Sequence, residues 1–174
     1  MRALFLATGF LISTCCLAQK DRKISACIAF NVNATQYDRT ISNNATGFGA
    51  GLQVYMRTKT WVRPALDLSA DVFGGTKLLY LTNDDKPIYA KDAITTLYAG
   101  AYFQPSRRFF AVLTGGPSFF NNHAYLGIKP GCGYYLLRSK QLAVKVCFTN
   151  VFQRDGISNQ SFGYWNFSLA AKLF

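Results

Sequence analysis

Apolar residues recur at every second position along most of this chain. In the stretch ISACIAFNVN, which begins at Ile24, they alternate with small or polar residues. This period is that of a β-strand with one apolar face, because successive side chains of a strand point to opposite sides. Similar runs predict eight strands, at about residues 24–33, 47–56, 62–72, 93–103, 108–119, 125–137, 141–152 and 162–173.

The composition also favours strands over helices. The chain has 15 Phe and 10 Tyr, which suit a pleated surface, and all of its acidic residues are Asp, so the common helix former Glu is missing. Beyond the N-terminal region, no segment has the roughly 18 unbroken apolar residues of a membrane helix. If this chain spans a membrane, strands must do it, and strands of about ten residues are long enough at a tilt.

Short turns and longer loops alternate between the predicted strands, with both chain ends on the short-turn side, as in bacterial outer-membrane barrels. The less apolar face carries small and mixed residues, which fit the inside of a narrow eight-stranded barrel, so the apolar face would meet lipid. A secreted soluble barrel is the alternative, but the long charged side chains of a water-facing surface are lacking. The short turns are 57–60, 104–107 and 138–140, the longer loops are 34–46, 74–92 and 153–160, and 121–124 is a short exception.

The N-terminal region predicts an exported protein. A basic start and the apolar run ALFLATGFLIST precede small residues that end at Ala18, which is the pattern of a cleaved signal peptide. We therefore expect a signal peptide at residues 1–18 and one barrel domain at 19–174. Acylation of Cys15 or Cys16 is an alternative, although neither follows the usual small Gly, Ala or Ser.

Cleavage would leave three cysteines, Cys27, Cys132 and Cys147. An odd number cannot form a complete disulfide framework. We expect these cysteines to act as small apolar side chains, with one bridge and one free thiol as the alternative.

Together these features resemble the small bacterial outer-membrane β-barrel proteins. The resemblance rests on the signal peptide, the alternating strands, the Gly-rich segments GFGAGLQVY and GIKPGCGYYL, and the terminal Phe174. It extends to OmpA-type and OmpX-type barrels and to the group described as outer-membrane β-barrel domain or porin family proteins. It implies an all-β fold, an eight-stranded antiparallel up-and-down transmembrane β-barrel in the bacterial outer membrane, among phospholipid and lipopolysaccharide. It is weak for function, because such barrels have structural, adhesive, transporting or enzymatic roles.

The resemblance also makes Phe174 the signal that the barrel-assembly machinery would recognise. In the usual pattern the last apolar residues are in phase with the final aromatic residue, whereas here Leu169 and Leu173 are one residue out of phase. We expect Phe174 to lie at the interface beyond the strand, with Leu173 facing lipid. A bulge that shifts the register is the alternative.

Several charged residues fall on the face that would line the lumen. Charges in a narrow lumen must be paired or hydrated, so we expect a network of salt bridges and hydrogen bonds that closes the pore. A gate or a path for small polar solutes is the alternative. The predicted network comprises Arg63, Asp67, Asp71, Lys129 and Lys145.

The chain has 19 Lys and Arg against 8 acidic residues, a formal net charge of +11. Many of these cations lie in the predicted short turns and would form a periplasmic basic rim that attracts anionic phospholipid head groups. Nucleic-acid binding would need the cations in one groove among exposed aromatic residues, and it conflicts with export. The predicted rim comprises Arg57, Lys59, Arg107, Arg108, Arg138 and Lys140.

His123 is the only histidine and the one candidate for catalysis. Outer-membrane lipid A deacylases and acyltransferases resemble this architecture and use a His with a Ser and an acidic partner. The nearest serine, Ser118, stands in no such motif, and we expect no catalytic activity. The sequence has no P-loop, no cysteine pair at zinc spacing and no calcium loop, so we expect neither a metal nor a cofactor.

Aromatic residues cluster near both ends of the predicted strands. Because amphipathic rings favour bilayer interfaces, we interpret them as two anchoring belts. The belt near the turns would comprise Tyr55, Trp61, Phe103, Phe109 and Tyr134 or Tyr135, and the belt near the loops Phe48, Phe73, Phe119, Phe120, Tyr125, Phe152, Phe162 and Trp165.

The sequence therefore predicts a monomeric outer-membrane barrel with a structural or adhesion-like surface-interaction role through its extracellular loops. A channel for small solutes or hydrophobic ligands is the alternative on the same fold. A lipid A-modifying enzyme that uses His123 is a third, less favoured one.

Overall fold

The computed structural model describes residues 24–36, 46–56, 58, 60–81, 87–120, 123–137, 139–152 and 161–173, with the backbone alone in 75–81 and 87–92. Its strands are β1 (Ile24–Thr35), β2 (Thr46–Met56), β3 (Val62–Leu81), β4 (Pro87–Phe103), β5 (Phe109–Phe120), β6 (His123–Tyr135), β7 (Leu142–Phe152) and β8 (Ser161–Lys172). In the part of the chain so described, no helix is long and apolar enough to cross a membrane. The predicted signal peptide, Arg57, Lys59, Arg138 and Phe174 lie outside the described residues.

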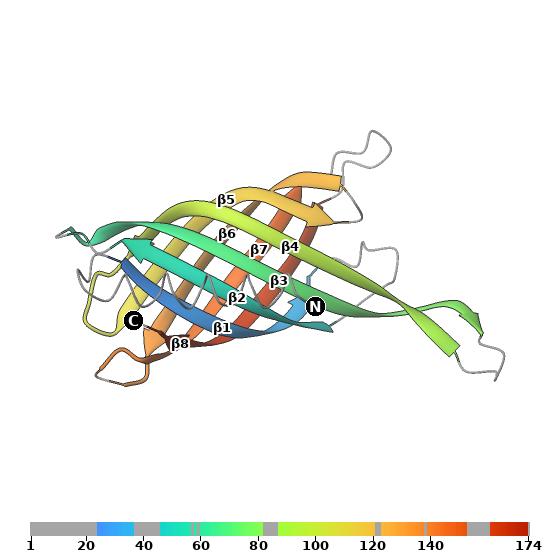
Figure 1. Ribbon diagram of the computed structural model, residues 1–174, viewed down its shortest axis with the longest axis horizontal. Coiled ribbons are helices and arrows are strands. Elements are labelled where there is room, and N and C mark those ends of the chain that lie inside the picture. The colour runs from blue at the N-terminus through green and yellow to red at the C-terminus, as the bar shows by residue number, and fades with distance from the viewer. Residues whose placement is uncertain are drawn as a thin grey trace, which may run out of the picture.

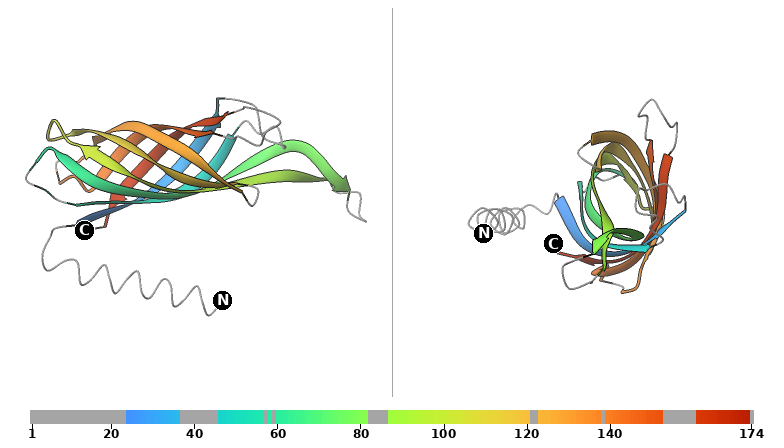
Figure 2. Two further views of the ribbon diagram at one scale, coloured as in Figure 1. Left: turned by 90° about the horizontal axis from the view of Figure 1, so that it is seen from above. Right: turned by 90° about the vertical axis from the view of Figure 1, so that its right-hand side faces the viewer.

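The strands form one closed barrel in chain order, with every neighbouring pair antiparallel. Closure is made by β1 and β8, which pair from Cys27 opposite Lys172 to Thr35 opposite Tyr164. Figure 1 shows the barrel from the side, with its tilted strands, and the right-hand view of Figure 2 looks along the barrel from one end. The predicted fold class, an all-β, eight-stranded antiparallel up-and-down barrel, is confirmed.

The register around the barrel sets the tilt of its strands. Cross-strand partners traced from Ser25 through all eight strands return to β1 at Thr35, a stagger of ten residues (35 minus 25). With about 3.3 Å per residue and about 4.8 Å between strands, this stagger corresponds to a tilt of about 40°. The partners on this path are Tyr55, Ala65, Gly100, Thr114, Lys129, Thr149 and Tyr164, with Thr149 placed opposite Lys129 by the flanking pairs Ile128–Asn150 and Gly131–Cys147.

The two faces of the strands divide as the alternation predicts. On β1, Ile28, Phe30 and Val32 are exposed, whereas Asn31 and Asn33 between and beside them are buried inside. The other strands show the same arrangement, with apolar side chains outside and polar side chains inside, which is the reverse of a water-soluble barrel. Large exposed apolar side chains on its outer surface include Phe48, Leu66, Leu68, Val72, Leu97, Leu113, Leu126, Ile128, Val144, Phe167 and Leu169.

Glycines make room for large side chains in the narrow interior. Gly133 lies opposite Phe110 on the neighbouring strand, and a methyl group added to it would overlap the Phe110 ring. Gly49 stands in the same relation to Asp71. The Gly-rich segments of β2 and β6 are therefore needed for the space that they leave in the lumen.

The segment 74–92, predicted as a long loop, is instead mostly β-structure. β3 and β4 continue as a hairpin to Leu81 and Pro87, with register shifts between Gly74 and Tyr80. The pairing of β3 with β2 ends at Gly74, so the hairpin extends beyond its neighbours, as the green strands in Figures 1 and 2 show. The prediction failed because it took the end of the regular apolar alternation for the end of the strand.

We expect Gly133→Ala to lower the free energy of unfolding by about 1–3 kcal/mol, since overpacking outweighs the gain of about 0.5–1 kcal/mol from replacing a strand glycine. The measurement is urea unfolding of the chain refolded in detergent micelles. Gly74→Ala is the matched control, because nothing lies within 4 Å of a methyl group added there, so it should show only the gain of about 0.5–1 kcal/mol from replacing a strand glycine. Equal effects of the two substitutions would contradict the assignment of Gly133 as a space-making residue.

Candidate functional site in the barrel lumen

The inward face of β3 passes through every level of the lumen. From the turn side to the loop side it presents Arg63, Asp67, Ser69, Asp71 and Phe73. Asp67 and Asp71 are 3% and 0% exposed, so each carboxylate depends on partners from strands across the barrel. The two carboxylates have different kinds of partner.

Asp67 pairs with two lysines from the opposite wall. Lys129 Nζ on β6 lies 2.8 Å from Asp67 Oδ1, and Lys145 Nζ on β7 lies 3.5 Å from Oδ2. All three side chains are buried. Both carboxylate oxygens are thus used, and the cluster carries one more positive than negative charge. Removal of the anion from a buried cluster of this kind would leave the ammonium groups uncompensated, which is strongly unfavourable.

Asp71 is held by uncharged donors. Its Oδ1 accepts hydrogen bonds from Asn31 Nδ2 at 3.2 Å and Asn33 Nδ2 at 2.8 Å. Its Oδ2 accepts from Ser69 Oγ and from the Tyr164 hydroxyl, both at 3.2 Å. Four donors from three strands therefore solvate this carboxylate in place of water, which meets the condition for burying a charge.

A further layer of polar contacts joins β8 to the Asp71 group. Asn166 Nδ2 donates to Asn33 Oδ1 at 2.7 Å and its Oδ1 accepts from Thr149 Oγ1 at 2.7 Å. Ser168 Oγ donates to Asn31 Oδ1 at 2.8 Å. The network thus continues across the β1–β8 junction that closes the barrel.

Aromatic rings fill the lumen on the turn side of Asp67. Tyr55 stacks on Tyr102 with centroids 4.6 Å apart, and Tyr102 stacks on Phe110 at 5.1 Å. The hydroxyl groups of Tyr102 and Tyr135 are 2.7 Å apart. Arg63, which the predicted charge network includes, belongs to this layer: its guanidinium carbon lies 5.9 Å from the Tyr55 ring and 6.0 Å from the Tyr102 ring.

A second aromatic cluster fills the lumen on the loop side of Asp71. Phe73 packs edge-on against Phe162 at 5.5 Å and against Tyr164 at 4.9 Å, and Phe120 stacks on Phe162 at 6.1 Å. Phe73 and Phe162 are fully buried. Ile94 and Val151 complete this cluster.

The proposed aromatic belts therefore need correction. Tyr55, Phe73, Phe120, Tyr135 and Phe162 are interior side chains, because each occupies an inward position of its strand. The outer surface does carry exposed aromatic residues near the strand ends. These are Phe48, Trp61, Phe109, Phe119, Tyr134, Phe152 and Trp165.

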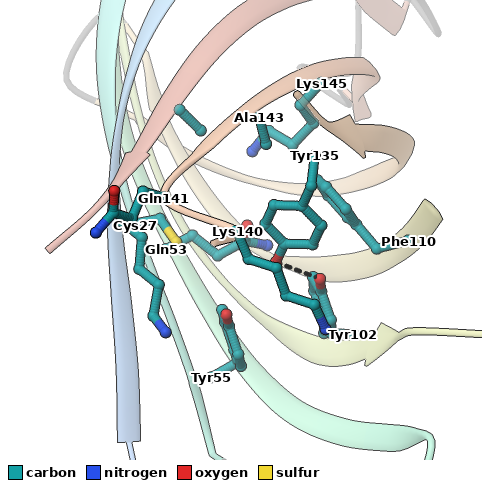
Figure 3. A pocket seen from close by; sticks show the side chains of 12 residues that line it. Cys27, Gln53, Tyr55, Tyr102, Phe110, Tyr135, Lys140, Gln141, Ala143 and Lys145 are labelled. Carbon is teal, nitrogen blue, oxygen red and sulfur yellow. Dashed lines mark hydrogen bonds between the residues drawn. The ribbon is translucent and has the colours of Figure 1, made fainter. Parts of the chain in front are cut away.

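A small cavity lies in the packed lumen, near its turn-side end. Its volume is about 10 Å³, which is room for about one water molecule. Figure 3 shows its lining, with Cys27 on one side and Tyr102 and Tyr135, joined by their hydrogen bond, on the other. Gln53 Nε2 is buried without a hydrogen-bond partner.

The described members of the predicted basic rim lie at the turn-side end. Arg107 and Arg108 are exposed in the turn after β4. Arg108 donates from a guanidinium nitrogen to the Tyr134 hydroxyl at 3.0 Å, and Lys140 Nζ lies 5.8 Å from the Tyr135 ring centroid. Aromatic side chains thus hold two of these cations near the strand ends.

The candidate catalytic residues point in different directions. Ser118 is buried, and its hydroxyl bonds to that of Tyr98 inside the barrel, whereas His123 is exposed at the start of β6. The acidic loop residues Asp84, Asp85 and Asp155 lie outside the described residues. Among those that are described, no group of three His, Cys or acidic side chains could hold a metal ion.

All three described cysteines are free. Cys27 and Cys147 are buried inside the barrel, and Cys132 is exposed on its outer surface. Their positions follow the strand alternation, with Cys132 on the apolar face of β6.

The sequence did not predict the hydrogen-bond donors of Asp71 or the aromatic layer on the turn side of Asp67. Asn31, Asn33 and Tyr164 are inward by strand parity, so their burial could have been found from the alternation. Their common partner could not, because it depends on the register between β1, β3 and β8.

No protein-family model and no curated protein sequence matches the chain. Among solved structures, the crystal structure of Ail, the attachment invasion locus protein of Yersinia pestis, is similar with a TM-score of 0.57 and 9% identity over 86% of this chain and 97% of Ail. Ail in a phospholipid bilayer nanodisc gives 0.56 and 9% over 86% and 99%. A de novo designed transmembrane β-barrel gives 0.51 and 10% over 86% and 95%. This chain thus has the fold of the small outer-membrane β-barrels, as the sequence resemblance implies.

We expect Asp67→Asn to lower the free energy of unfolding by about 3–5 kcal/mol, because it leaves two buried ammonium groups without their anion. Lys129→Met should have a smaller effect, since Lys145 keeps its contact with Asp67. The two variants are compared by urea unfolding of the refolded chain. A loss for Lys129→Met that equals or exceeds that of Asp67→Asn would show that Lys145 does not share the carboxylate.

Proposed function

We propose that this protein is an integral barrel of the bacterial outer membrane with a surface-interaction role through its projecting β3–β4 hairpin and its loops. The outward apolar surface supports membrane insertion, because lipid is the medium in which such a surface is stable. An 11-residue strand such as β2, tilted by about 40°, rises about 28 Å. That height is close to the apolar band of about 25 Å on known outer-membrane barrels.

The hairpin is the observation that carries the interaction role. Past Gly74 on β3 and before Ile94 on β4, the described pairing is between these two strands alone. Seven residues beyond Gly74, at about 3.3 Å each, extend about 23 Å along the strand. Such a length exceeds what spanning a bilayer needs and presents two strand edges to partners outside it.

A filled lumen completes the proposal. Two aromatic layers and the buried polar network between them occupy the lumen, and the cavity near its turn-side end has room for only about one water molecule. This packing supports a plugged barrel over a channel. The separation of His123 from the Ser118 hydroxyl by direction and burial supports a non-catalytic role. Phospholipid, lipopolysaccharide and the barrel-assembly machinery are the proposed partners of the monomer, with Phe174 as the assembly signal, and export would use residues 1–18 as a cleaved signal.

The first test is topology on intact cells. We expect an epitope inserted between Asp84 and Asp85 to bind antibody on unbroken cells, because these residues join Leu81 to Pro87 in the chain and thus connect the two strands of the projecting hairpin. The same epitope inserted between Pro105 and Ser106, in a turn at the other end, should bind only after the outer membrane is permeabilised. Labelling of both sites, or of neither, on intact cells would overturn the proposed orientation.

The second test separates the interaction role from the barrel. We expect deletion of residues 77–89, closed by a short Gly-containing turn, to leave a barrel that still migrates differently in SDS gels with and without boiling. Cells that display this variant should attach less to protein-coated surfaces than cells that display equal amounts of the full chain. If both kinds of cell attach equally and display equal amounts of folded barrel, the interaction role does not depend on the hairpin.

The filled lumen gives a third prediction, which bears on the channel alternative. The refolded protein should give no stepwise conductance in planar bilayers, since water cannot pass the buried Asp67 cluster. A channel would instead show conductance steps that Asp67→Asn or Lys129→Met changes, and such steps would remove the plugged-barrel proposal.

A further inference from the structure

The turn between β4 and β5, residues 104–108, is held in shape by hydrogen bonds of its own side chains. Ser106 Oγ accepts from the backbone N–H of Phe109 at 2.9 Å. Gln104 Nε2 donates to the carbonyl oxygen of Arg107 at 3.4 Å. Side chains that bond to the backbone in this way fix the shape of a turn, and so they fix the point from which the two arginines of this turn leave the barrel.

The side chain of Arg108 is also held in place, against the outer surface of the barrel. Its guanidinium donates to the Tyr134 hydroxyl at 3.0 Å and lies 5.9 Å from the centre of that ring. Tyr134 is exposed on the outward face of β6, opposite Phe109 of β5. A phenol takes only one of the N–H donors of a guanidinium and leaves its charge unneutralised.

No described carboxylate neutralises Arg107 or Arg108. Among the residues whose side chains are described, only Asp67 and Asp71 are acidic, and both are buried in the lumen with partners of their own. Arg107 and Arg108 are adjacent in the chain and both are exposed. Two neighbouring guanidinium groups repel each other, and an external anion would relieve that repulsion.

Aromatic side chains on both sides of the turn indicate its depth in a bilayer. Trp61 and Phe103, with ring centroids 6.1 Å apart, belong to its β3–β4 side, and Phe109 and Tyr134 to its β5–β6 side. Trp and Tyr favour the interface between bilayer and water, so the turn between them would lie at the level of the lipid phosphates. Further along β5, the exposed Leu113 would contact the acyl chains of a lipid bound at the turn.

We infer that Arg107 and Arg108 bind the phosphate of an anionic phospholipid on the outer surface of the barrel, with Tyr134 holding Arg108 in position. Guanidinium groups suit phosphate because their paired N–H donors match its oxygens. The Ser106 hydroxyl, which accepts from the turn, can also donate a hydrogen bond to the phosphate.

The charge of the site also predicts which lipid it prefers. Phosphatidylethanolamine carries an ammonium group beside its phosphate, and two adjacent arginines repel that group. Phosphatidylglycerol has the phosphate without the ammonium group. The site therefore favours phosphatidylglycerol; it rests on the proposed insertion of the barrel in a membrane and names one lipid and the residues that hold it.

The two tryptophans of the chain allow the bound lipid to be detected. Trp61 lies beside the turn, where its carbonyl oxygen accepts from Gln104 N at 2.9 Å, and Trp165 lies near the loop-side end of β8. The Trp165→Phe variant is placed in phosphatidylcholine vesicles that contain brominated lipid, which quenches nearby tryptophan fluorescence. Brominated phosphatidylglycerol should be favoured about fivefold over phosphatidylcholine at Trp61, the effect of about one cation at a lipid surface. Brominated phosphatidylethanolamine should show little preference.

Further substitutions in this background separate a built site from a general attraction by the basic rim. Arg108→Gln should remove most of the preference, and Tyr134→Phe should weaken it because the guanidinium loses its support. Lys172→Gln is the matched control: it removes one cation from the same end of the barrel, but on β8 beside the lumen cavity, and should keep the preference. Trp165, observed in a Trp61→Phe variant, should show no preference.

Three outcomes would contradict the inference. Equal quenching of Trp61 by brominated phosphatidylglycerol and phosphatidylcholine, or equal losses in Arg108→Gln and Lys172→Gln, would leave only a general attraction by the rim. Loss of the preference when inorganic phosphate is added at constant ionic strength would assign the arginines to a soluble phosphate. An absence of quenching by any brominated lipid would contradict membrane insertion itself, and with it the proposed function.

Discussion

Closure of only eight strands is the constraint on which the rest of this structure depends. It leaves an interior so narrow that opposite walls touch through their side chains, and the polar groups there have almost no water to bind. Each inward residue must therefore find its partner on another strand. Asp67 finds ammonium groups, Asp71 finds amides and hydroxyls, and the tyrosines find one another. Gly49 and Gly133 have no side chain for the same reason, because the large side chain on the neighbouring strand occupies the space that one would need.

The two buried carboxylates are solvated in chemically different ways. The Asp67 carboxylate is neutralised by two ammonium groups, and these lysines link β3 to β6 and β7 across the lumen. The Asp71 carboxylate accepts hydrogen bonds from uncharged amide and hydroxyl groups. Its donors lie on β1, β3 and β8, around the junction that closes the barrel. The first arrangement holds opposite walls at a fixed separation. The second holds the ends of the sheet together, in addition to the backbone pairing and the side-chain hydrogen bonds of Asn166 and Ser168 between β1 and β8.

Much of this architecture can be read from the alternation of residue types. The strand number, the inward face of β1 and β3 and the outward apolar surface all follow from a period of two, which depends only on local backbone geometry. The same rule would have placed Tyr55 and Phe73 inside, but residue type was given more weight than parity at the strand ends. The different partners of Asp67 and Asp71 could not be predicted from the sequence, because they depend on the stagger between strands that are distant in the chain. The hairpin past Gly74 was missed because, once a strand leaves the barrel, neither lipid nor lumen imposes the alternation by which it was recognised.

The Asp67 cluster also has a consequence for the order of assembly. Its contacts join residues 62 and 78 positions apart in the chain, so neither the first four strands nor the last four can complete it. A half-formed sheet entering the bilayer would carry either an unpaired carboxylate or two unpaired ammonium groups at lipid depth, which is strongly unfavourable. Insertion of the middle strands is thereby coupled to closure of the ring. The slow step of folding is expected to be this joint event, in keeping with a topology dominated by contacts between distant parts of the chain.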